Sequence, residues 1–244
     1  MKRSTLHAVC DAGRAGRGIV RAVDIASGEE RLIDIASGNS QLERAAADAA
    51  RIDRSAVADA DGRTWFLDVC NPPLDLAIIG AVHIAQILAR IAHLAGYGVR
   101  VIDPRGAFAS PDRFPDVSLS LQWPDEAFAK EPLGSRSALV ALAHDPKLDD
   151  PALAAALRTT CFYIGALGSK KTHAARLARL GAHGFGDKEL IRIHGPIGLA
   201  IGARSPAEIA ISILAEMTMK LRADDVWERS IVRATANTGF TPRS

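Results

Sequence analysis

The fold is decided by the stretch Leu74-Asp75-Leu76-Ala77-Ile78-Ile79-Gly80-Ala81-Val82-His83-Ile84-Ala85. Its first six residues form a short apolar run of the kind found in buried strands, and Gly80 ends that run. A helix is expected over residues 83–95, because the apolar residues there recur at spacings of three and four. A buried strand that passes through a glycine turn into a helix is the basic unit of a parallel α/β sheet.

The same alternation of strands and helices continues along the chain. Apolar runs predict further buried strands at residues 99–103, 137–142 and 161–165. Start signals predict three more helices: one capped by Asp150 with Pro151 at its first position, one over residues 171–180, and one opened by the capping box Ser205-Pro206-Ala207-Glu208. The sequence therefore predicts an α/β fold with a Rossmann-like parallel sheet flanked by helices.

The residues before this region predict a small N-terminal α+β domain. We expect a hairpin over residues 18–35, a helix over 41–52 capped by Asn39 or Ser40, and a strand over 64–69. The run Asn71-Pro72-Pro73 marks a domain boundary. The expected parts are the N-terminal α+β domain at 1–72, the Rossmann-like domain at 73–222 and a polar tail at 223–244.

The composition argues against a nucleic-acid binder and against a membrane protein. Hydrophobic residues make up 48% of the 244 residues and the net charge is only +2, without the basic stripe of a nucleic-acid binder. Arg14, Arg17 and Arg21 share one Gly-rich stretch, which is either a solvated loop or an arm that follows phosphates. Polar residues interrupt the most hydrophobic stretch, 74–99, and no apolar run follows the first three residues. We therefore expect neither a membrane span nor a signal peptide, and a cytoplasmic location.

Metal-binding and hydrolase motifs are absent from the sequence. Cys10, Cys70 and Cys161 are an odd number with no CxxC pair, so we expect reduced thiols. The histidines lack the spacing of a metal cluster. Because there is no G-x-S-x-G elbow, hydrolase chemistry has no support.

The first candidate binding motif is the turn Gly80-Ala81-Val82-His83. It occupies the position of the dinucleotide fingerprint G-x-G-x-x-G/A, and Asp103 ends the next strand where a ribose-binding carboxylate would lie. Val82, however, stands where a glycine would let the backbone approach a pyrophosphate. Three interpretations stay open: NAD in its usual pose, a turn that only packs, or a ligand whose phosphate lies elsewhere along the same sheet edge.

The second candidate motif is the run Tyr163-Ile164-Gly165-Ala166-Leu167-Gly168-Ser169-Lys170-Lys171-Thr172-His173. A strand again ends in a glycine-rich turn and enters a helix. The turn carries hydroxyl groups and two lysines, which suit an anion. The alternative is an ordinary capped helix with solvated lysines.

The third candidate motif is the apolar, glycine-rich run Ile193-His194-Gly195-Pro196-Ile197-Gly198-Leu199-Ala200-Ile201-Gly202. Such a loop, packed on the carboxyl edge of a sheet, suits the wall of a ligand pocket. A single histidine such as His194 is more often a structural hydrogen-bond partner than a ligand contact. Arg105 and Arg113 would form a cationic rim suited to bidentate phosphate binding, or they are ordinary surface arginines.

Taken together, these segments resemble the XdhC/CoxI family, the accessory proteins of xanthine dehydrogenase and related molybdenum hydroxylases, in a short form. The runs 164–173 and 194–199 are rather specific to that family, whereas the Gly80 motif alone is not. The resemblance spans about residues 62–220. The matching stretches are 74–85, 101–115, 144–145, 163–180 and 194–216.

The resemblance implies a cytoplasmic chaperone rather than an enzyme. Such a chaperone binds and protects the molybdenum cofactor, as molybdopterin or its cytosine dinucleotide, and delivers it in sulfurated form to an apoenzyme. The implied partners are a target molybdenum hydroxylase of the xanthine dehydrogenase type, a cysteine desulfurase and a second copy in a homodimer.

Three features depart from the family pattern. Val82 stands where the family usually has glycine, and Ala200 stands where many relatives have aspartate. The part up to about Asp61 lacks the Gly- and Cys-containing motif of full-length members. Because the family also has split forms, the resemblance adds a separate small XdhC/CoxI-type protein to the partners.

Three functions stay open on the sequence alone: a molybdenum cofactor chaperone, an NAD(P)-dependent oxidoreductase, and a structural scaffold with a vestigial pocket. The chaperone is the leading hypothesis, and it needs no catalytic or metal-ligating residue. Its candidate cofactor-binding residues are Gly80, Ala81, His83, Asp103, Arg105, Gly165, Gly168, Ser169, Lys170, Lys171, His194 and Gly195.

Overall fold

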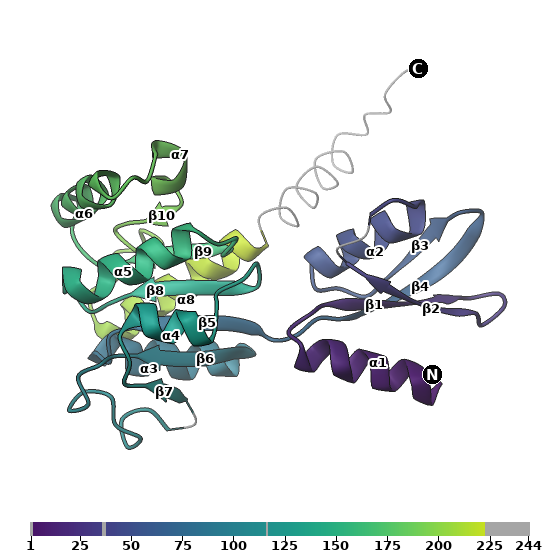
Figure 1. Cartoon of the computed structure of the whole chain (residues 1–244), viewed down its shortest axis with the longest axis horizontal. Helices are drawn as coiled ribbons and strands as arrows, with labels where there is room; N and C mark the ends of the chain where they lie inside the picture. The colour runs from purple at the N-terminus through teal and green to yellow at the C-terminus, as the bar shows by residue number, and fades with distance from the viewer. Residues whose placement is uncertain (1, 36–37, 116, 223–244) are drawn as a thin grey trace. The chain divides into compact units, whose positions relative to one another are not determined.

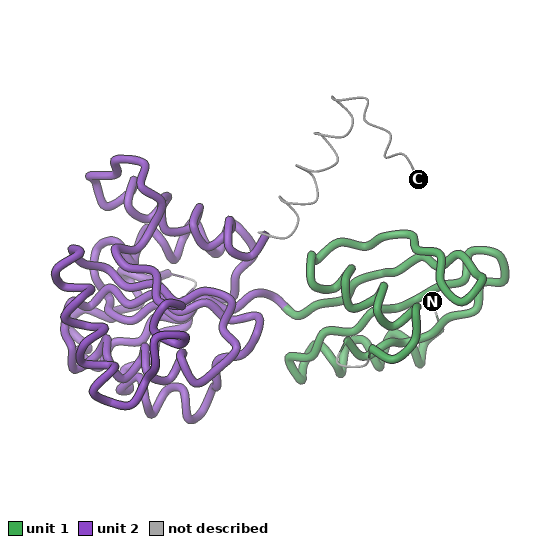
Figure 2. The backbone as a smooth tube through the Cα atoms, turned by 90° about the horizontal axis from the view of Figure 1, so that it is seen from above, with its two compact units in different colours: residues 1–72, 224–244 green, residues 73–223 purple. Residues whose placement is uncertain are grey.

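A computed structural model of the chain describes residues 2–35, 38–115 and 117–222. The described residues divide into two compact units, one within residues 1–72 and one within residues 73–222 (Figure 2). The predicted polar tail, 223–244, lies outside the described residues.

The N-terminal unit is an antiparallel sheet with a helix on each face (Figure 1). Its strands are β1 (Ile19–Asp24), β2 (Glu30–Asp34), β3 (Ala56–Ala60) and β4 (Arg63–Cys70), in the order β2-β1-β4-β3. Its helices are α1 (Arg3–Arg14) and α2 (Gln41–Arg51). Leu42 and Ala46 of α2 pack with the buried Trp65 and Leu67 of β4, so α2 covers the face that carries this unit's core.

Several local predictions for this unit are decided by the structure. Of the two predicted caps, Ser40 is the one that begins α2, because its side chain accepts a hydrogen bond from the Glu43 N–H. The helix α1 and the strand β3 were not predicted. The interpretation of the Arg14–Arg21 stretch as one solvated loop is wrong, since Arg14 ends α1 and Arg21 lies in β1, paired with Glu30 and Asp68.

The second unit is a six-stranded parallel sheet, which confirms the predicted fold class (Figure 1). The strand order is β10-β9-β8-β5-β6-β7. The strands are β5 (Leu74–Ile79), β6 (Tyr97–Ile102), β7 (Ser118–Ser120), β8 (Ser137–Ala141), β9 (Tyr163–Ala166) and β10 (Ile193–His194). The helices are α3 (His83–Leu94), α4 (Pro124–Lys130), α5 (Pro146–Leu157), α6 (Lys170–Ala182), α7 (Asp187–Leu190) and α8 (Pro206–Leu221).

Helices cover both faces of this sheet, which explains why its central strands are apolar throughout. Helices α3 and α8 pack on one face, where Leu76 and Ile78 of β5 are buried. Helices α4, α5 and α6 pack on the other face, against Ala77 and Ile79. All four of these β5 side chains are fully buried.

The predicted start of the helix capped by Asp150 is wrong. Helix α5 begins five residues earlier, where Asp145 caps it by accepting a hydrogen bond from the Lys147 N–H at 2.9 Å and Pro146 takes the first position. Pro151 therefore lies inside the helix. Asp150 instead binds the Arg179 guanidinium through two hydrogen bonds of 2.6 and 3.0 Å. The segment has two Asp/Pro start signals, and periodicity alone does not choose between them.

Strand β5 lies at the topological switch point of the sheet, because the chain runs from it first to β6 on one side and later to β8 on the other. The turn after β5 approaches the turn after β8 very closely there. Gly80 has φ +97°, and a Cβ on it would lie 2.8–2.9 Å from the backbone N, Cα and Cβ of Ala143. Only glycine fits this conformation and this space.

We expect Gly80→Ala to lower the free energy of unfolding by about 3 kcal/mol or more, since it adds a clash with backbone to an unfavourable positive φ. Gly96→Ala is the matched control, because Gly96 has φ +88° but nothing within 4 Å of its added Cβ. That control should lose only about 1 kcal/mol. Urea unfolding followed by far-UV circular dichroism measures both. Equal losses in the two variants would contradict the proposed steric constraint.

Candidate functional site at the carboxyl edge of the sheet

The predicted site residues lie at or beside the carboxyl edge of the parallel sheet, in two groups. Residues 80–83 follow β5 and residues 103–105 follow β6. The second group comprises residues 165–171, at the end of β9 and the start of α6, and residues 194–195, at the end of β10. Strand β8 separates the groups, so β5 and β9 are two strand spacings apart, about 10 Å. The structure therefore brings the residues to one edge but not into one cluster.

In the first group, Asp103 ties the turns together. It is fully buried, and its carboxylate accepts hydrogen bonds from the Ala81 N–H at 2.8 Å and the Arg105 N–H at 3.0 Å. The Arg105 guanidinium adds two further hydrogen bonds of 2.9 Å. Burial would raise the pKa of Asp103, but these hydrogen bonds outweigh it and hold the pKa below its ordinary value. Asp103 thus stays charged and is fully engaged inside the protein.

This geometry changes the role expected of Asp103. A ribose-binding carboxylate must present an oxygen to the ligand, whereas both oxygens of Asp103 accept bonds from the protein itself. The group that reaches the surface is Arg105, whose side chain is 39% exposed and lies over the Phe108 ring at 5.0 Å. Asp103 therefore fixes a cation at the edge and does not offer a carboxylate there.

In the second group, the turn between β9 and α6 is open to solvent. Ser169 caps α6 by accepting a hydrogen bond from the Thr172 N–H at 3.1 Å, and Lys170 and Lys171 are exposed. The first amides of a helix have no partner within it, so the turn presents N–H groups and two cations together. Gly168, with φ +148°, makes the turn.

A buried ion pair links this turn to the turn after β8. The Arg176 guanidinium, with its side chain 2% exposed, donates to the Leu167 carbonyl at 2.9 Å and lies 3.9 Å from the Asp149 carboxylate. Asp149 also accepts a hydrogen bond from the Ala143 N–H at 3.3 Å. Nε and Nη1 of Arg176 have no partner among the described residues. Burial raises the pKa of Asp149 to about 6, although Arg176 opposes that shift.

Four of the twelve predicted residues are buried and contact other parts of the protein. Gly80 and Ala81 are the buried part of the turn after β5, Asp103 is internal, and Gly165 lies in β9 with Ile197 packed over it. The other eight reach the surface at least in part: His83, Arg105, Gly168, Ser169, Lys170, Lys171, His194 and Gly195. Ligand contact by any of the twelve stays a prediction.

Sequence reasoning missed the buried polar residues that support the edge. Asp149, Arg176 and Glu216 are each buried, and His173 packs on Gly195 so closely that a Cβ there would meet its ring. One signal was available for Glu216, because a charged residue stands beside the apolar stripe of Ile213 and Met217.

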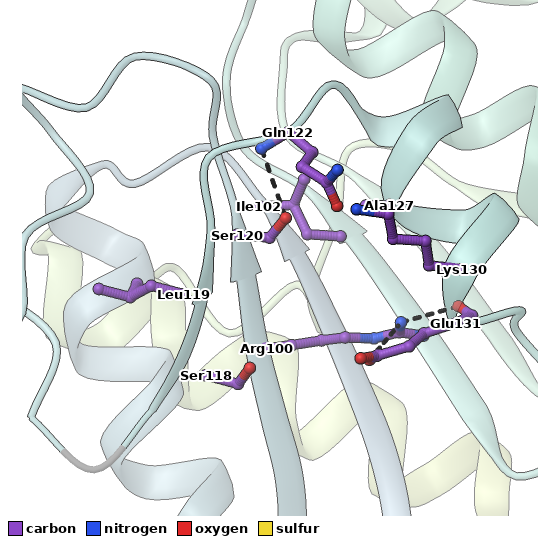
Figure 3. Close-up of a pocket in the computed structure, with 9 residues that line it drawn as sticks. All are labelled: Arg100, Ile102, Ser118, Leu119, Ser120, Gln122, Ala127, Lys130 and Glu131. Atoms are coloured by element: carbon purple, nitrogen blue, oxygen red, sulfur yellow. Dashed lines mark hydrogen bonds and ion pairs between the residues drawn. The ribbon is translucent and has the colours of Figure 1, made fainter.

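A separate cavity of about 210 Å³ lies between β6, β7 and α4 (Figure 3). None of the twelve predicted residues lines it. Arg100, on its wall, donates to the Glu131 backbone carbonyl and carboxylate and to the Asp75 carboxylate. Because the Arg100 side chain is only 10% exposed, the cavity offers an anion less than the sheet edge does, where Arg105 is partly exposed and Lys170 and Lys171 are exposed.

No group of three or more His, Cys, Asp or Glu side chains in residues 2–35, 38–115 and 117–222 is arranged to hold a metal ion. Over the same residues, no helix has both the length and the apolar character needed to cross a bilayer.

The pKa of Asp149 predicts a pH-dependent contribution to stability. Its folded value of about 6 is above the ordinary value of 3.8, so the folded state favours the protonated form. The cost of ionisation is therefore absent below about pH 4, grows as pH rises, and reaches about 3 kcal/mol above about pH 6. Relative to the wild type, Asp149→Asn should gain about that amount in unfolding free energy between pH 4 and pH 7.

Urea titrations at a series of pH values measure the difference, with Asp187→Asn, at the exposed start of α7, as the control. A difference between Asp149→Asn and the wild type that does not change with pH would count against this assignment.

Comparison with known proteins identifies the family of the second unit. Residues 76–217 match the XdhC Rossmann domain. The chain is 32% identical over 147 residues to the molybdenum cofactor insertion chaperone PaoD of Escherichia coli (strain K12), covering 60% of this chain and 40% of PaoD. It is 30% identical over 153 residues to a probable xanthine dehydrogenase subunit of Bacillus subtilis (strain 168), covering 62% and 44%. An uncharacterized protein of E. coli, YqeB, is 31% identical over 152 residues, covering 62% and 28%.

A solved structure supports the fold over both units. The crystal structure of a xanthine dehydrogenase from Bacillus halodurans matches with a TM-score of 0.67 at 23% identity, covering 91% of this chain and 65% of that one. The chain spans less than half the length of the three curated relatives. Because the family match covers more than half of its 244 residues, the chain belongs to the family that carries the XdhC Rossmann domain.

Proposed function

We propose that this protein is an accessory chaperone that holds the molybdenum cofactor as cargo and presents it to a hydroxylase of the xanthine dehydrogenase type. Membership of the XdhC family and the similarity to PaoD, a molybdenum cofactor insertion chaperone, support this function. The similarity to a probable xanthine dehydrogenase subunit points to the same class of client.

The observation that carries the proposal is the Ala81–Asp103–Arg105 tie at the switch point. Ligands of open α/β sheets bind in the crevice outside the carboxyl ends of the strands at this point. Asp103 holds Arg105 through two side-chain hydrogen bonds of 2.9 Å, so the guanidinium stays fixed, and 39% of the side chain is exposed. A fixed, partly exposed arginine at that position suits the phosphate that molybdopterin carries.

The edge is long enough for a cargo with two recognisable ends. The ends of β6 and β9 are three strand spacings apart, about 14 Å. Arg105 lies at one end of this span, and the α6 turn with Ser169, Lys170 and Lys171 lies toward the other. We place the phosphate at Arg105 and the polar pterin, or in the dinucleotide form a second phosphate, toward the α6 turn.

The site is suited to binding rather than to catalysis. The carboxylates Asp103, Asp149 and Glu216 face inward and hold the protein's own loops. This arrangement favours a carrier over the NAD(P)-dependent oxidoreductase, since the usual ribose contact is already occupied.

We further propose the form of the cargo, the partners of the carrier and its location. The cargo is delivered in sulfurated form, and a cysteine desulfurase is the partner that supplies the sulfur. The carrier works in the cytoplasm as a homodimer, with a separate small XdhC/CoxI-type protein as a further partner. Pull-down of the tagged chain with a cysteine desulfurase, and analytical ultracentrifugation of the chain, test the two main assemblies.

We expect Arg105→Ala to weaken retention of the cargo at least tenfold, because it removes a charge-assisted contact to phosphate. The chain is purified from cells that make the molybdenum cofactor, passed through ultrafiltration, and oxidised so that bound pterin is measured by fluorescence. Arg90→Ala, an exposed arginine on α3, is the matched control and should retain as much as the wild type. If the wild type retains no pterin but binds NAD or NADP in calorimetry, the proposal is wrong.

A further inference from the structure

His194 is held by two contacts of its ring, one to an aromatic ring and one to a carboxylate. Its ring stacks on the Tyr163 ring, with centroids 5.0 Å apart and planes 20° apart. Its Nδ1 lies 3.2 Å from the Glu216 carboxylate. No hydrogen bond to its second nitrogen, Nε2, is found among the described residues, and the side chain is 22% exposed. Nδ1 is thus bound by the protein, whereas Nε2 has no partner in the described part of the chain, and the residue itself is the last one of β10.

Glu216 fixes which nitrogen carries the proton. It lies on α8 and is largely buried, and its Oε2 accepts hydrogen bonds from the Tyr163 hydroxyl at 2.5 Å and the Gly198 N–H at 2.8 Å. Its Oε1 faces His194 Nδ1. A carboxylate only accepts, so Nδ1 must donate, and in the neutral ring Nε2 is then an unprotonated acceptor.

Burial of a carboxylate is unfavourable unless its hydrogen bonds compensate, and an apolar residue of similar size would pack α8 on β9 as well. The contacts of Glu216 do more than pack the helix. They hold the loop at Gly198, the hydroxyl of Tyr163 and the proton of His194 in one arrangement.

We propose that Tyr163 and Glu216 are positioning residues that present His194 Nε2 as a fixed acceptor to an N–H group of the pterin ring. This inference rests on the proposed function, because it assigns the pterin end of the cargo to the β10 side of the edge. Strand β10 lies four strand spacings, about 19 Å, from β6, which carries Arg105 at its end. Phosphate and pterin would then be recognised by different chemistry at opposite ends of one span.

The isosteric variant Glu216→Gln gives a sharp test. The Gly198 N–H is always a donor, so the amide oxygen of Gln must take the position of Oε2. The amide NH₂ then faces His194 and donates to Nδ1, which moves the imidazole proton to Nε2. The acceptor at the edge becomes a donor without a change in side-chain size.

Long-range ¹H–¹⁵N NMR of the cargo-free full chain at about pH 8.5 reports the tautomer directly. His194→Gln assigns the signals. We expect protonated Nδ1 in the wild type and in Tyr163→Phe, which keeps the ring stack, and protonated Nε2 in Glu216→Gln. Glu208→Gln, at the capping box of the same helix, is the matched control and should leave the tautomer unchanged. A wild-type ring protonated at Nε2, or a Glu216→Gln ring still protonated at Nδ1, would overturn the inference whether or not cargo binds.

Retention of co-purified pterin tests the functional half. Glu216→Gln and His194→Gln should each retain at least tenfold less pterin than the wild type, while Glu208→Gln should retain as much. Wild-type retention in Glu216→Gln with an inverted tautomer would refute the contact to pterin and leave the carrier function intact. Loss of pterin from the wild type itself would instead refute the carrier function. Should Glu216→Gln fail to fold, the wild-type tautomer and His194→Gln still decide the matter.

Discussion

The carboxyl edge of the sheet depends on one repeated interaction, a buried carboxylate that accepts the N–H of a strand-end loop. Asp103 accepts from Ala81 after β5, Asp149 from Ala143 after β8, and Glu216 from Gly198 after β10. Each carboxylate also faces one basic side chain, respectively Arg105, Arg176 and His194. Loops of a parallel sheet otherwise leave such amides to water or to a ligand. Here the protein supplies the acceptors itself, and the shape of the edge follows from them.

The three basic side chains differ in how exposed they are and in how many of their nitrogens have partners. This difference separates the pairs suited to ligand contact from the pair that only supports the loops. Arg105 and His194 each keep part of the side chain exposed while the carboxylate fixes the rest. Arg176 is buried with two nitrogens unpartnered among the described residues, and burial shifts the pKa of Asp149 upward. A poorly matched buried pair destabilises more than it helps, and the role that its contacts support is to link two turns, at Leu167 and Ala143. The Asp103–Arg105 and Glu216–His194 pairs suit contact with a ligand, and the Asp149–Arg176 pair between them holds the intervening turns in place.

The sequence was sufficient for the fold and for the location of the edge, but not for the direction in which side chains point. Strands β5 and β8 could be predicted because both of their faces are buried, so nearly every residue is apolar. The start of α5 was misplaced because Asp150-Pro151 repeats the start signal of Asp145-Pro146. Asp103 was correctly placed at the end of β6 but expected to face a ribose, because spacing does not reveal that Arg105, two residues on, would turn back onto it. Glu216 is 53 residues from Tyr163 along the chain, and no local pattern connects them.

Loops that are held by carboxylates of the same chain stay ordered when no ligand is bound. A loop that is ordered only by its ligand loses that order on release, and each binding event must overcome the entropy of ordering it again. The loops after β5, β8 and β10 are held by carboxylates of the same chain, and the close contact of Gly80 with Ala143 leaves the first two little room to move. The geometry of the edge therefore does not depend on a bound ligand. Under the proposed carrier function, a cargo can then leave in one step, because release breaks only the contacts to the cargo and leaves the contacts among the loops intact.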